Sequence, residues 1–268
     1  MSERAPIADG VSVFAARTPT LPPATHTNAV ILGRRAVWVV DPASPWPEEQ
    51  EATAQALSDL EVAAIVLSHH HLDHVSGAED LRARTGAPIL ATAETAARVP
   101  FAVDRLIAEG DALETDAGVW RVMHTPGHAS GHVVLDRGDV VVAGDMIAGV
   151  GTIVLDPPEG ALHLYLNSLR RLRDLGPRRL IPSHGPVIDD GPAILDTYIH
   201  HRHMRTAQVR EALAPRGPAQ PEALVEPIYG ALHPLIAMVA ARQVLAHLQW
   251  LGREGEAAEQ ADGAWSLI

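Results

Sequence analysis

An apolar run that ends in a cluster of histidines places the strongest constraint on the fold of this chain. Residues 62–68, VAAIVLS, are typical of a buried strand, and the sequence HHHLDH follows them directly. His69 and His71 are two residues apart, so on an extended segment their side chains project to the same side. Asp73 and His74 follow where the chain turns into the next predicted helix. Two imidazoles and a further imidazole–carboxylate pair can therefore face one small volume.

The composition restricts the chemistry that this cluster can perform. The chain has no cysteine, so disulfides, thiolate nucleophiles and cysteine-containing zinc sites are excluded. Its 21 basic residues are all arginines, which excludes a Schiff base, a P-loop lysine and a Ser-x-x-Lys β-lactamase site. The formal net charge of −12 argues against a general nucleic-acid coat protein, because non-specific binding depends on cations that neutralise phosphates. We therefore expect no DNA partner, and any metal must be held by His, Asp and Glu.

The hydropathy pattern gives no sign of a membrane segment. No apolar run approaches the roughly 18 residues that a membrane span requires. The start of the sequence, MSERAPIADG, lacks a basic region followed by an apolar one. We expect a cytoplasmic protein without a membrane partner.

Short apolar runs alternate with turn residues through the first part of the chain. Residues 28–33 and 36–41 predict a hairpin, and residues 48–60 and 77–84 predict helices with a strand between them. Further strands are predicted at PILAT, VWRVMHT, HVVLD and VVVAGD. The order β-β-α-β-α-β-β-β predicts an α/β layered domain over residues 1–194, with functional loops at the strand ends.

The last quarter of the chain has a different character. Before it, an apolar stripe at helical spacing over residues 161–175 predicts a helix packed on the sheet, and the strand RRLIP follows. Two long helices are then predicted at AILDTYIHHRHMRTAQVREAL and PLIAMVAARQVLAHLQWL, with a linker between them. Asp262-Gly263, near the end, is a hairpin signal. Residues 195–268 are therefore predicted to form a small helical, winged-helix-like domain.

Three later strand ends each present one more residue of the kind that binds metals. HTPGH presents His128 in a Pro-Gly turn, VVVAGDM ends in Asp145, and IPSHGP presents His184. With these residues the chain resembles the metallo-β-lactamase-fold hydrolase superfamily, over residues 11–194. The resemblance implies an αββα sandwich that holds two metal ions.

The resemblance also implies a role for each residue of the motifs. It implies a first ion on His69, His71 and His128, a second ion on Asp73, His74 and His184, and Asp145 as the bridge between them. It implies that Asp41, at the end of VWVVD, supports the ligand loops without binding metal. His132, four residues after His128, is a further candidate for such a supporting role.

Two ions held in this way predict a hydrolase. Divalent ions about 3.5–4 Å apart can share a bridging hydroxide that is nucleophilic at neutral pH, and they can polarise the group to be cleaved. Asp73 is the candidate proton acceptor as well as a metal ligand. Ligation by His and Asp alone suits Zn²⁺, with iron or manganese as alternatives.

The motifs leave the substrate open. With a bridging carboxylate at Asp145, the chain resembles glyoxalase II, ribonucleases and related esterases, which have such a carboxylate, rather than true β-lactamases, which lack it. The C-terminal half resembles the branch of lactamase-beta-like protein 2, an endoribonuclease. That resemblance implies single-stranded RNA as the substrate, with Arg202 and Arg205 as contacts on a basic helix face. A solvated helix face accounts for the same arginines equally well.

Two other functions are consistent with the same motifs. The architecture accommodates a small ester or thioester, as in glyoxalase II, with at most weak β-lactamase activity. The third interpretation is a non-enzymatic metal-binding scaffold whose winged-helix-like unit binds a partner. The complete ligand set argues against the scaffold, because a scaffold needs neither two metals nor an open hydroxide position.

Overall fold

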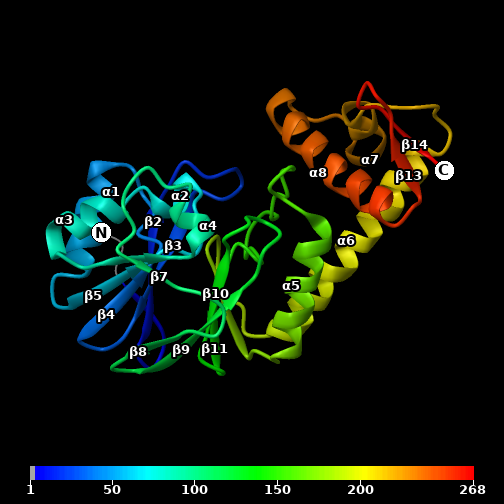
Figure 1. Ribbon diagram of the computed structural model, residues 1–268. Helices are drawn as coiled ribbons and strands as arrows, with labels where there is room; N and C mark the ends of the chain where they lie inside the picture. The colour runs from blue at the N-terminus through cyan, green and yellow to red at the C-terminus, as the bar shows by residue number, and fades with distance from the viewer. Residues whose placement is uncertain (1–3) are drawn as a thin grey trace.

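Two β-sheets form the centre of the molecule in the computed structural model, which describes residues 4–268 (Figure 1). The first sheet contains, in spatial order, β1 (Ala5–Ala8), β2 (Val11–Arg17), β3 (His26–Leu32), β4 (Ala36–Val40), β5 (Glu61–Val66), β6 (Ile89–Ala91) and β7 (Arg105–Leu106). The second contains β12 (Arg179–Pro182), β11 (Val140–Gly144), β10 (Val133–Asp136), β9 (Gly118–His124) and β8 (Ala112–Thr115).

Apolar side chains from both sheets fill the space between them. Val66 and Leu90 of the first sheet belong to the same buried cluster as Trp120, Val122 and Val142 of the second. Side chains alternate between the two faces of a strand, so the outer face of each sheet carries apolar residues that need their own cover.

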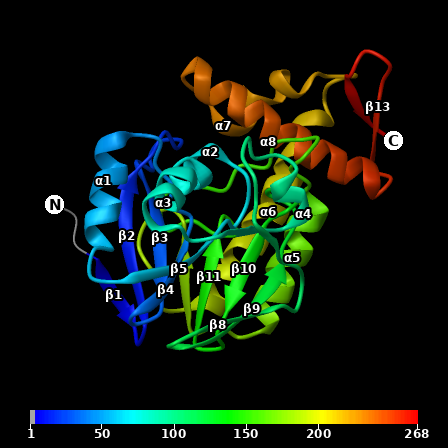
Figure 2. The ribbon, with the colours of Figure 1, turned by 60° about the vertical axis from the view of Figure 1, so that its left-hand side comes forward.

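Helices provide that cover on both sides (Figure 2). On the first sheet lie α1 (Pro47–Ala56) and α3 (Ala78–Thr85), while α2 (Leu72–Val75) and α4 (Ala93–Ala96) follow β5 and β6. On the second sheet lie α5 (Leu162–Asp174) and the first turns of α6 (Gly191–Leu213). The apolar stripe of α5 is buried, and the predicted αββα order is confirmed.

The strand ends place the predicted site residues at one edge of the sandwich. β4 and β5 are parallel, and so are β11 and β12. The carboxyl ends of parallel strands meet at the same edge of a sheet. Asp41 follows β4, His69 follows the end of β5, Asp145 follows β11 and His184 follows β12.

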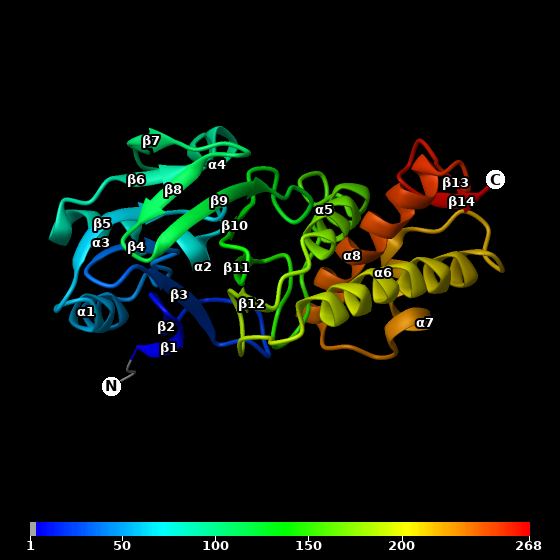
Figure 3. The same cartoon turned by 90° about the horizontal axis from the view of Figure 1, so that it is seen from below.

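The remaining residues form a helical unit beside the second sheet (Figure 3). The unit contains the end of α6, a 3-10 helix (Pro221–Leu224), α7 (Val225–Tyr229), α8 (Pro234–Arg253), β13 (Ala257–Glu259) and β14 (Trp265–Leu267). The hairpin predicted at Asp262-Gly263 is confirmed, because β13 and β14 pair antiparallel on either side of it. α6 runs without a break from the sheet into this unit, so the predicted boundary after residue 194 falls inside a helix.

Two parts of the first sheet and its cover differ from the sequence predictions. The helix predicted over residues 48–60 ends at Ala56, and a turn through Leu60 leads into β5. β1 and β2 are not predicted, since Ala15 and Ala16 have little intrinsic preference for strands. Pairing along the whole of β2 with β3 defines this strand instead.

None of the helices within residues 4–268 is, by itself, both long and apolar enough to cross a membrane. One pair of segments, Pro221–Tyr229 and Pro234–Arg253, meets that requirement only when the two are counted together, and the chain bends by 108° between them.

Candidate metal centre

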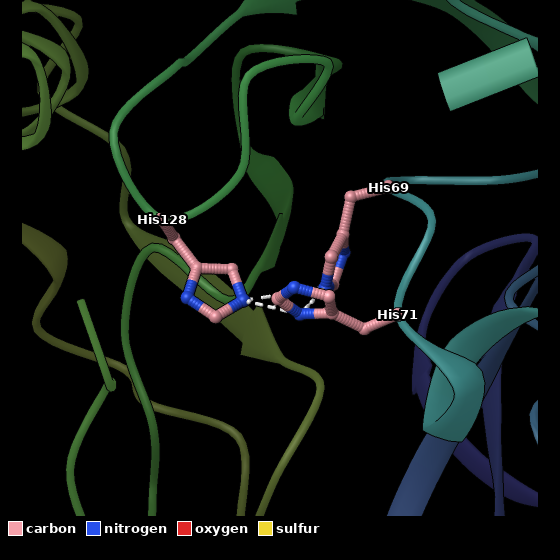
Figure 4. A group of neighbouring side chains, drawn as sticks. All are labelled: His69, His71 and His128. Atoms are coloured by element: carbon pink, nitrogen blue, oxygen red, sulfur yellow. Dashed lines mark hydrogen bonds between the residues drawn. The ribbon is translucent and has the colours of Figure 1, made fainter. Parts of the chain in front are cut away.

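Three imidazole nitrogens meet at the edge of the sandwich. His69 and His71 come from the loop after β5, and His128 points toward them from the loop between β9 and β10 (Figure 4). Nδ1 of His71 lies 3.0 Å from Nε2 of His69 and 2.9 Å from Nε2 of His128, and the two Nε2 atoms are 3.3 Å apart. Ligands about 2.1 Å from a tetrahedral zinc ion lie roughly 3.4 Å from one another, so this spacing suits one ion.

A second group of ligand atoms lies beside the first. Nε2 of His184 is 3.5 Å from Oδ2 of Asp73, and Nε2 of His74 is 3.9 Å from Oδ1 of the same residue. Asp73, His74 and His184 offer three ligand atoms that all lie within 4.8 Å of one another. The structure therefore brings together the three residues expected to hold the second ion.

Asp145 lies between the two groups. Its Oδ2 is 3.4 Å from Nε2 of His128, in the first group. Its Oδ1 is 3.6 Å from Nε2 of His74 and 3.5 Å from Nε2 of His184, in the second group. One carboxylate oxygen faces each group, which is the arrangement that a bridging ligand requires.

Hydrogen bonds on the far side of two rings determine which nitrogen each ring presents. Nδ1 of His128 donates to the carbonyl of Val154 at 2.8 Å, and Nδ1 of His184 donates to the carbonyl of His26 at 2.9 Å. A neutral imidazole that donates from Nδ1 keeps the lone pair of Nε2. In both residues that lone pair faces the site, as a metal ligand needs.

Asp41 lies behind the ligands and binds the loop that carries them. Its Oδ1 accepts from the backbone N–H of Ser68 at 2.8 Å, and its Oδ2 accepts from the Ser68 hydroxyl at 2.6 Å. The same Oδ2 lies 2.9 Å from Nδ1 of His74. Asp41 thus turns Nε2 of His74 toward the site without offering an oxygen of its own to it.

His132 holds Asp145 in a similar way. The ring is fully buried, and its Nε2 accepts from the backbone N–H of Asp145 at 3.0 Å. Its Nδ1 therefore donates to the hydroxyl of Thr125, at 2.7 Å. Gly144 leaves room for this ring, because a Cβ at that position would lie 2.5 Å from Nε2 of His132.

Two buried atoms of the site have no hydrogen-bond partner among the described residues. They are Nε2 of His74 and Oδ1 of Asp145, which face each other across the second group. A buried polar atom without a partner costs roughly 1–3 kcal/mol. A divalent cation would accept a lone pair from each atom, so the residues present fit a metal.

The charges of the site also favour a cation. Burial lowers the pKa of His71 to about 4, so its imidazole is neutral at pH 7 and keeps a free lone pair. Burial raises the pKa of Asp145, because little water reaches this carboxylate to stabilise its negative charge. Burial lowers the pKa of His74, but the carboxylates of Asp145 and Asp41 outweigh it and raise the value to about 9. His and Asp donors of this kind suit zinc, iron or manganese.

The arginines expected to contact RNA do not form an open basic face. Only 3% of Arg202 is exposed, and its Nη2 donates to the carbonyl of Ile153 at 2.6 Å. The burial of Arg202 gives no support to the predicted contact with a polyanion, because the guanidinium lies inside the molecule. Arg205 is partly buried, with its Cζ 4.2 Å from the centre of the Tyr229 ring.

A cavity of about 750 Å³ opens onto both ligand groups. Its walls come from three parts of the chain that are far apart in sequence, namely residues 19–24, residues 148–159 and one face of α8. His71, Asp73, His128, Asp145 and His184 line it at the metal centre.

Four charged residues that line this cavity were not expected from the sequence, and His70 pairs with one of them. Nε2 of His70 lies 3.2 Å from Oε2 of Glu159, and Oε1 of Glu159 lies 3.7 Å from Nε of Arg98. Arg242 of α8 pairs with Asp156. His70 belongs to the histidine cluster, but no spacing rule relates the other four residues to it.

Comparison with known proteins identifies the class of the chain. The sequence pattern of the Metallo-beta-lactamase superfamily matches residues 22–184, and that of the Beta-lactamase associated winged helix domain matches residues 221–265. The chain therefore belongs to the metallo-beta-lactamase superfamily. The predicted winged-helix-like character of the C-terminal unit is confirmed.

Curated relatives in this superfamily have different names. A Beta-lactamase-like protein 2 homolog of Drosophila melanogaster is 30% identical over 213 residues, which are 73% of this chain and 70% of the relative. An Atrochrysone carboxyl ACP thioesterase of Aspergillus chevalieri is 31% identical over 217 residues, which are 77% of this chain and 68% of the relative. A Hydroxyacylglutathione hydrolase of Cereibacter sphaeroides is 40% identical over 124 residues, which are 46% of this chain and 48% of the relative.

Solved structures share the fold. A Beta-lactamase domain protein from Burkholderia ambifaria superposes with a TM-score of 0.88 at 22% identity, and covers 99% of this chain and 93% of its own. A second protein, crystallised in a di-iron-bound form, has a TM-score of 0.55 at 28% identity and covers 66% of this chain and 96% of its own. Together these likenesses support a hydrolase with a metal site at the edge of the sandwich.

Proposed function

We propose that the protein is a dinuclear metal-dependent hydrolase that cleaves a small ester or thioester with an apolar acyl group. The observation that carries this proposal is the cavity of about 750 Å³, which joins the two ligand groups to apolar walls. A cavity of this size can hold an acyl chain while its carbonyl lies at the metal centre. The names of the related thioesterase and hydroxyacylglutathione hydrolase support the same class of substrate.

The walls of the cavity favour an apolar acyl group. Apolar side chains contribute to all three walls: Leu21, Pro22, Pro23, Val150, Val154, Pro157, Pro158, Ile236 and Val239. Each methylene that a substrate buries against such a wall contributes about 0.8 kcal/mol. A chain of several methylenes would therefore bind measurably better than an acetyl group.

The charges at the cavity give little support to RNA. Its two arginines, Arg98 and Arg242, each have an acidic neighbour, at Glu159 and Asp156. A polyanion needs cations that are free to neutralise its phosphates. Because Arg202 is buried as well, it gives no support to an RNA contact, and RNA cleavage becomes an outcome of the test.

Each residue of the site would have a distinct role in the reaction. When bound, two divalent ions supply a hydroxide nucleophile from water at neutral pH and polarise the acyl carbonyl. Asp73 lines the cavity, where a carboxylate oxygen can accept the proton that the water loses. Asp41 and His132 keep His74 and Asp145 aimed at the site.

A substrate panel tests this proposal. The zinc-loaded and manganese-loaded protein would be given acetyl-, hexanoyl- and benzoyl-coenzyme A, an acyl-glutathione, a lactone, an unstructured single-stranded RNA and a cephalosporin. We expect the acyl compounds to be hydrolysed, with kcat/KM higher for hexanoyl-coenzyme A than for acetyl-coenzyme A. RNA and the cephalosporin should be cleaved slowly or not at all.

The Asp145→Ala variant is the control for contaminating hydrolases. It keeps the cavity walls but removes the oxygen that faces each ligand group. Hydrolysis at the wild-type rate in this variant would point to a contaminating hydrolase or to a bridge that lies elsewhere, and the metal content of the variant distinguishes the two. RNA cleavage by the wild type alone, without acyl hydrolysis, would replace the proposed substrate class with a phosphodiester.

A further inference from the structure

One segment connects the C-terminal helices to the metal centre. It consists of residues 148–158, and we call it the strap. The strap follows β11 and lines the cavity before the chain enters α5. On its inner side the carbonyl of Val154 accepts from Nδ1 of His128 at 2.8 Å, and the N–H of Gly149 donates to the carbonyl of His184 at 2.7 Å. The strap therefore contacts one expected ligand of each ion.

The C-terminal helices bind the strap on its other side. Arg202 of α6 donates from Nη2 to the carbonyl of Ile153 at 2.6 Å, and Gln243 of α8 donates from Nε2 to the same oxygen at 3.0 Å. The Gln243 amide oxygen in turn accepts from Nη1 of Arg202 at 3.4 Å. At the start of the strap, the hydroxyl of Tyr198 bonds both the N–H and the carbonyl of Ala148.

The two contacts of the strap at Ile153 and Val154 are one residue apart. The carbonyl of Ile153 belongs to the planar peptide unit whose nitrogen is that of Val154. Once Arg202 and Gln243 fix this peptide plane, only the φ and ψ angles of Val154 decide where its own carbonyl points. That carbonyl orients the His128 ring.

The burial of Arg202 is costly if it serves packing alone. Only 3% of the residue is exposed and its Nε has no hydrogen-bond partner among the described residues. A buried cation without a carboxylate partner is expensive. The Tyr165 ring, whose centre is 5.1 Å from Cζ of Arg202, offsets part of this cost.

We infer that Arg202 and Gln243 are positioning residues for His128, acting through the strap, so that the C-terminal unit determines how tightly the first ion is held. This inference rests on the dinuclear site of the proposed function, but it does not depend on the substrate. The hydrogen bond that orients a metal-binding imidazole commonly changes metal affinity about 10–100-fold. The effect should be concentrated on the ion that His128 binds.

The test measures metal binding and strap mobility rather than hydrolysis. Full-length Arg202→Met, Arg202→Lys and Gln243→Met variants would be titrated with zinc against a chromophoric chelator. We expect Arg202→Met to weaken the first ion about tenfold and the second much less, with partial recovery in Arg202→Lys. In the metal-free protein, amide hydrogen exchange at residues 148–158 should become faster in Arg202→Met than in the wild type.

Arg210→Met is the matched control. Arg210 is on the same helix, but it pairs with Glu256 inside the C-terminal unit and is remote from the strap in sequence and contacts. It should leave zinc affinity and strap exchange unchanged. If Arg202→Met does not fold, Gln243→Met removes one donor to Ile153 and is expected to give a smaller change in the same direction.

Two results would overturn the inference. One is a folded Arg202→Met protein with wild-type affinity for both ions and wild-type exchange in the strap. The other is an equal loss of both ions together with a lowered melting temperature, which would mean that Arg202 only stabilises the domain. Absence of acyl hydrolysis would refute the proposed substrate and leave these binding measurements unaffected.

Discussion

Oδ2 of Asp41 lies 2.9 Å from Nδ1 of His74, and both side chains are almost completely inaccessible to solvent. Asp41 also has a positive φ of 53°, which places its side chain under the loop that follows β5. Few residues other than Gly tolerate that conformation, and Asn and Asp are among them. The backbone and the carboxylate therefore cooperate in aiming Nε2 of His74 at the site.

Replacing Asp41 with Asn should weaken the second ion. Asn tolerates the positive φ, but it lacks the charge and one of the acceptor oxygens that Ser68 and His74 use. We expect the affinity for the second ion to fall about 10–100-fold, with a smaller change for the first. Zinc titration against a chelator measures both. Asp139→Asn, an exposed carboxylate paired with Arg137, is the control, and equal affinities in the two variants would contradict a supporting role for Asp41.

Replacing Asp145 with Ala should reduce the metal content from two ions per chain to one. Its two oxygens face different groups, so the variant loses a ligand from each, and the second group keeps Asp73 as its carboxylate. Turnover should fall by orders of magnitude. Elemental analysis after zinc loading measures the stoichiometry, with the exposed Asp174→Ala as control. Two ions retained by Asp145→Ala would show that the bridge lies elsewhere.

Replacing Ile236 with Ser should change the preference for acyl chain length. Ile236 lines the cavity, whereas its neighbour Leu235 is 67% exposed and does not. Losing this apolar surface should raise KM for hexanoyl-coenzyme A by about tenfold, and KM for acetyl-coenzyme A much less. Leu235→Ser is the matched control and should behave like the wild type. The same KM change for both thioesters would mean that α8 does not contact the acyl chain.

Replacing His247 with Gln should flatten the dependence of stability on pH. Burial lowers the pKa of His247 well below 6.5, and Arg202 and Arg205 lower it further, with smaller contributions from His201 and His203. The folded protein therefore keeps this ring neutral at pH values where the unfolded chain binds a proton. Stability from this residue is present above pH 6.5 and is lost as the pH falls below that value.

Urea unfolding at pH 7.5, 6.0 and 5.0 measures this effect. Below pH 6.5 the wild type should lose up to about 1.4 kcal/mol per pH unit more than His247→Gln, which is the value for one proton. Gln can retain a hydrogen bond with the Thr206 hydroxyl, which now lies 2.8 Å from Nδ1 of His247. Parallel pH profiles for the two proteins would show that another group controls acid unfolding.

The sequence alone predicts which expected ligands lie close together, because most of them follow an apolar run that is typical of a strand. The carboxyl ends of such strands meet at one edge of a sheet, so His69, His128, Asp145 and His184 converge wherever the sheets form. Local pattern and global fold agree at these positions. The αββα layers could be predicted for the same reason.

The environment of Arg202 was harder to predict, although a signal exists. Leu195, Arg202 and Val209 are spaced seven residues apart, and all three are buried on one face of α6. Because its side chain is charged, Arg202 is readily assigned to the polar face of the helix, although its spacing places it on the apolar stripe. The cavity walls gave no such signal, because contacts between distant segments such as Pro22 and Val239 arise only when the sheets and the C-terminal unit have assembled.

The expected metal ligands all precede Gly185, whereas the cavity wall is completed only at Arg242 of α8. A ribosome therefore synthesises every expected metal ligand before it makes the helix that completes the cavity wall. The same order places the expected ligands and the last part of the cavity wall in different parts of one gene. Mutations of residues of α8 that line the cavity, such as Ile236, can therefore change the cavity while every expected ligand stays in place.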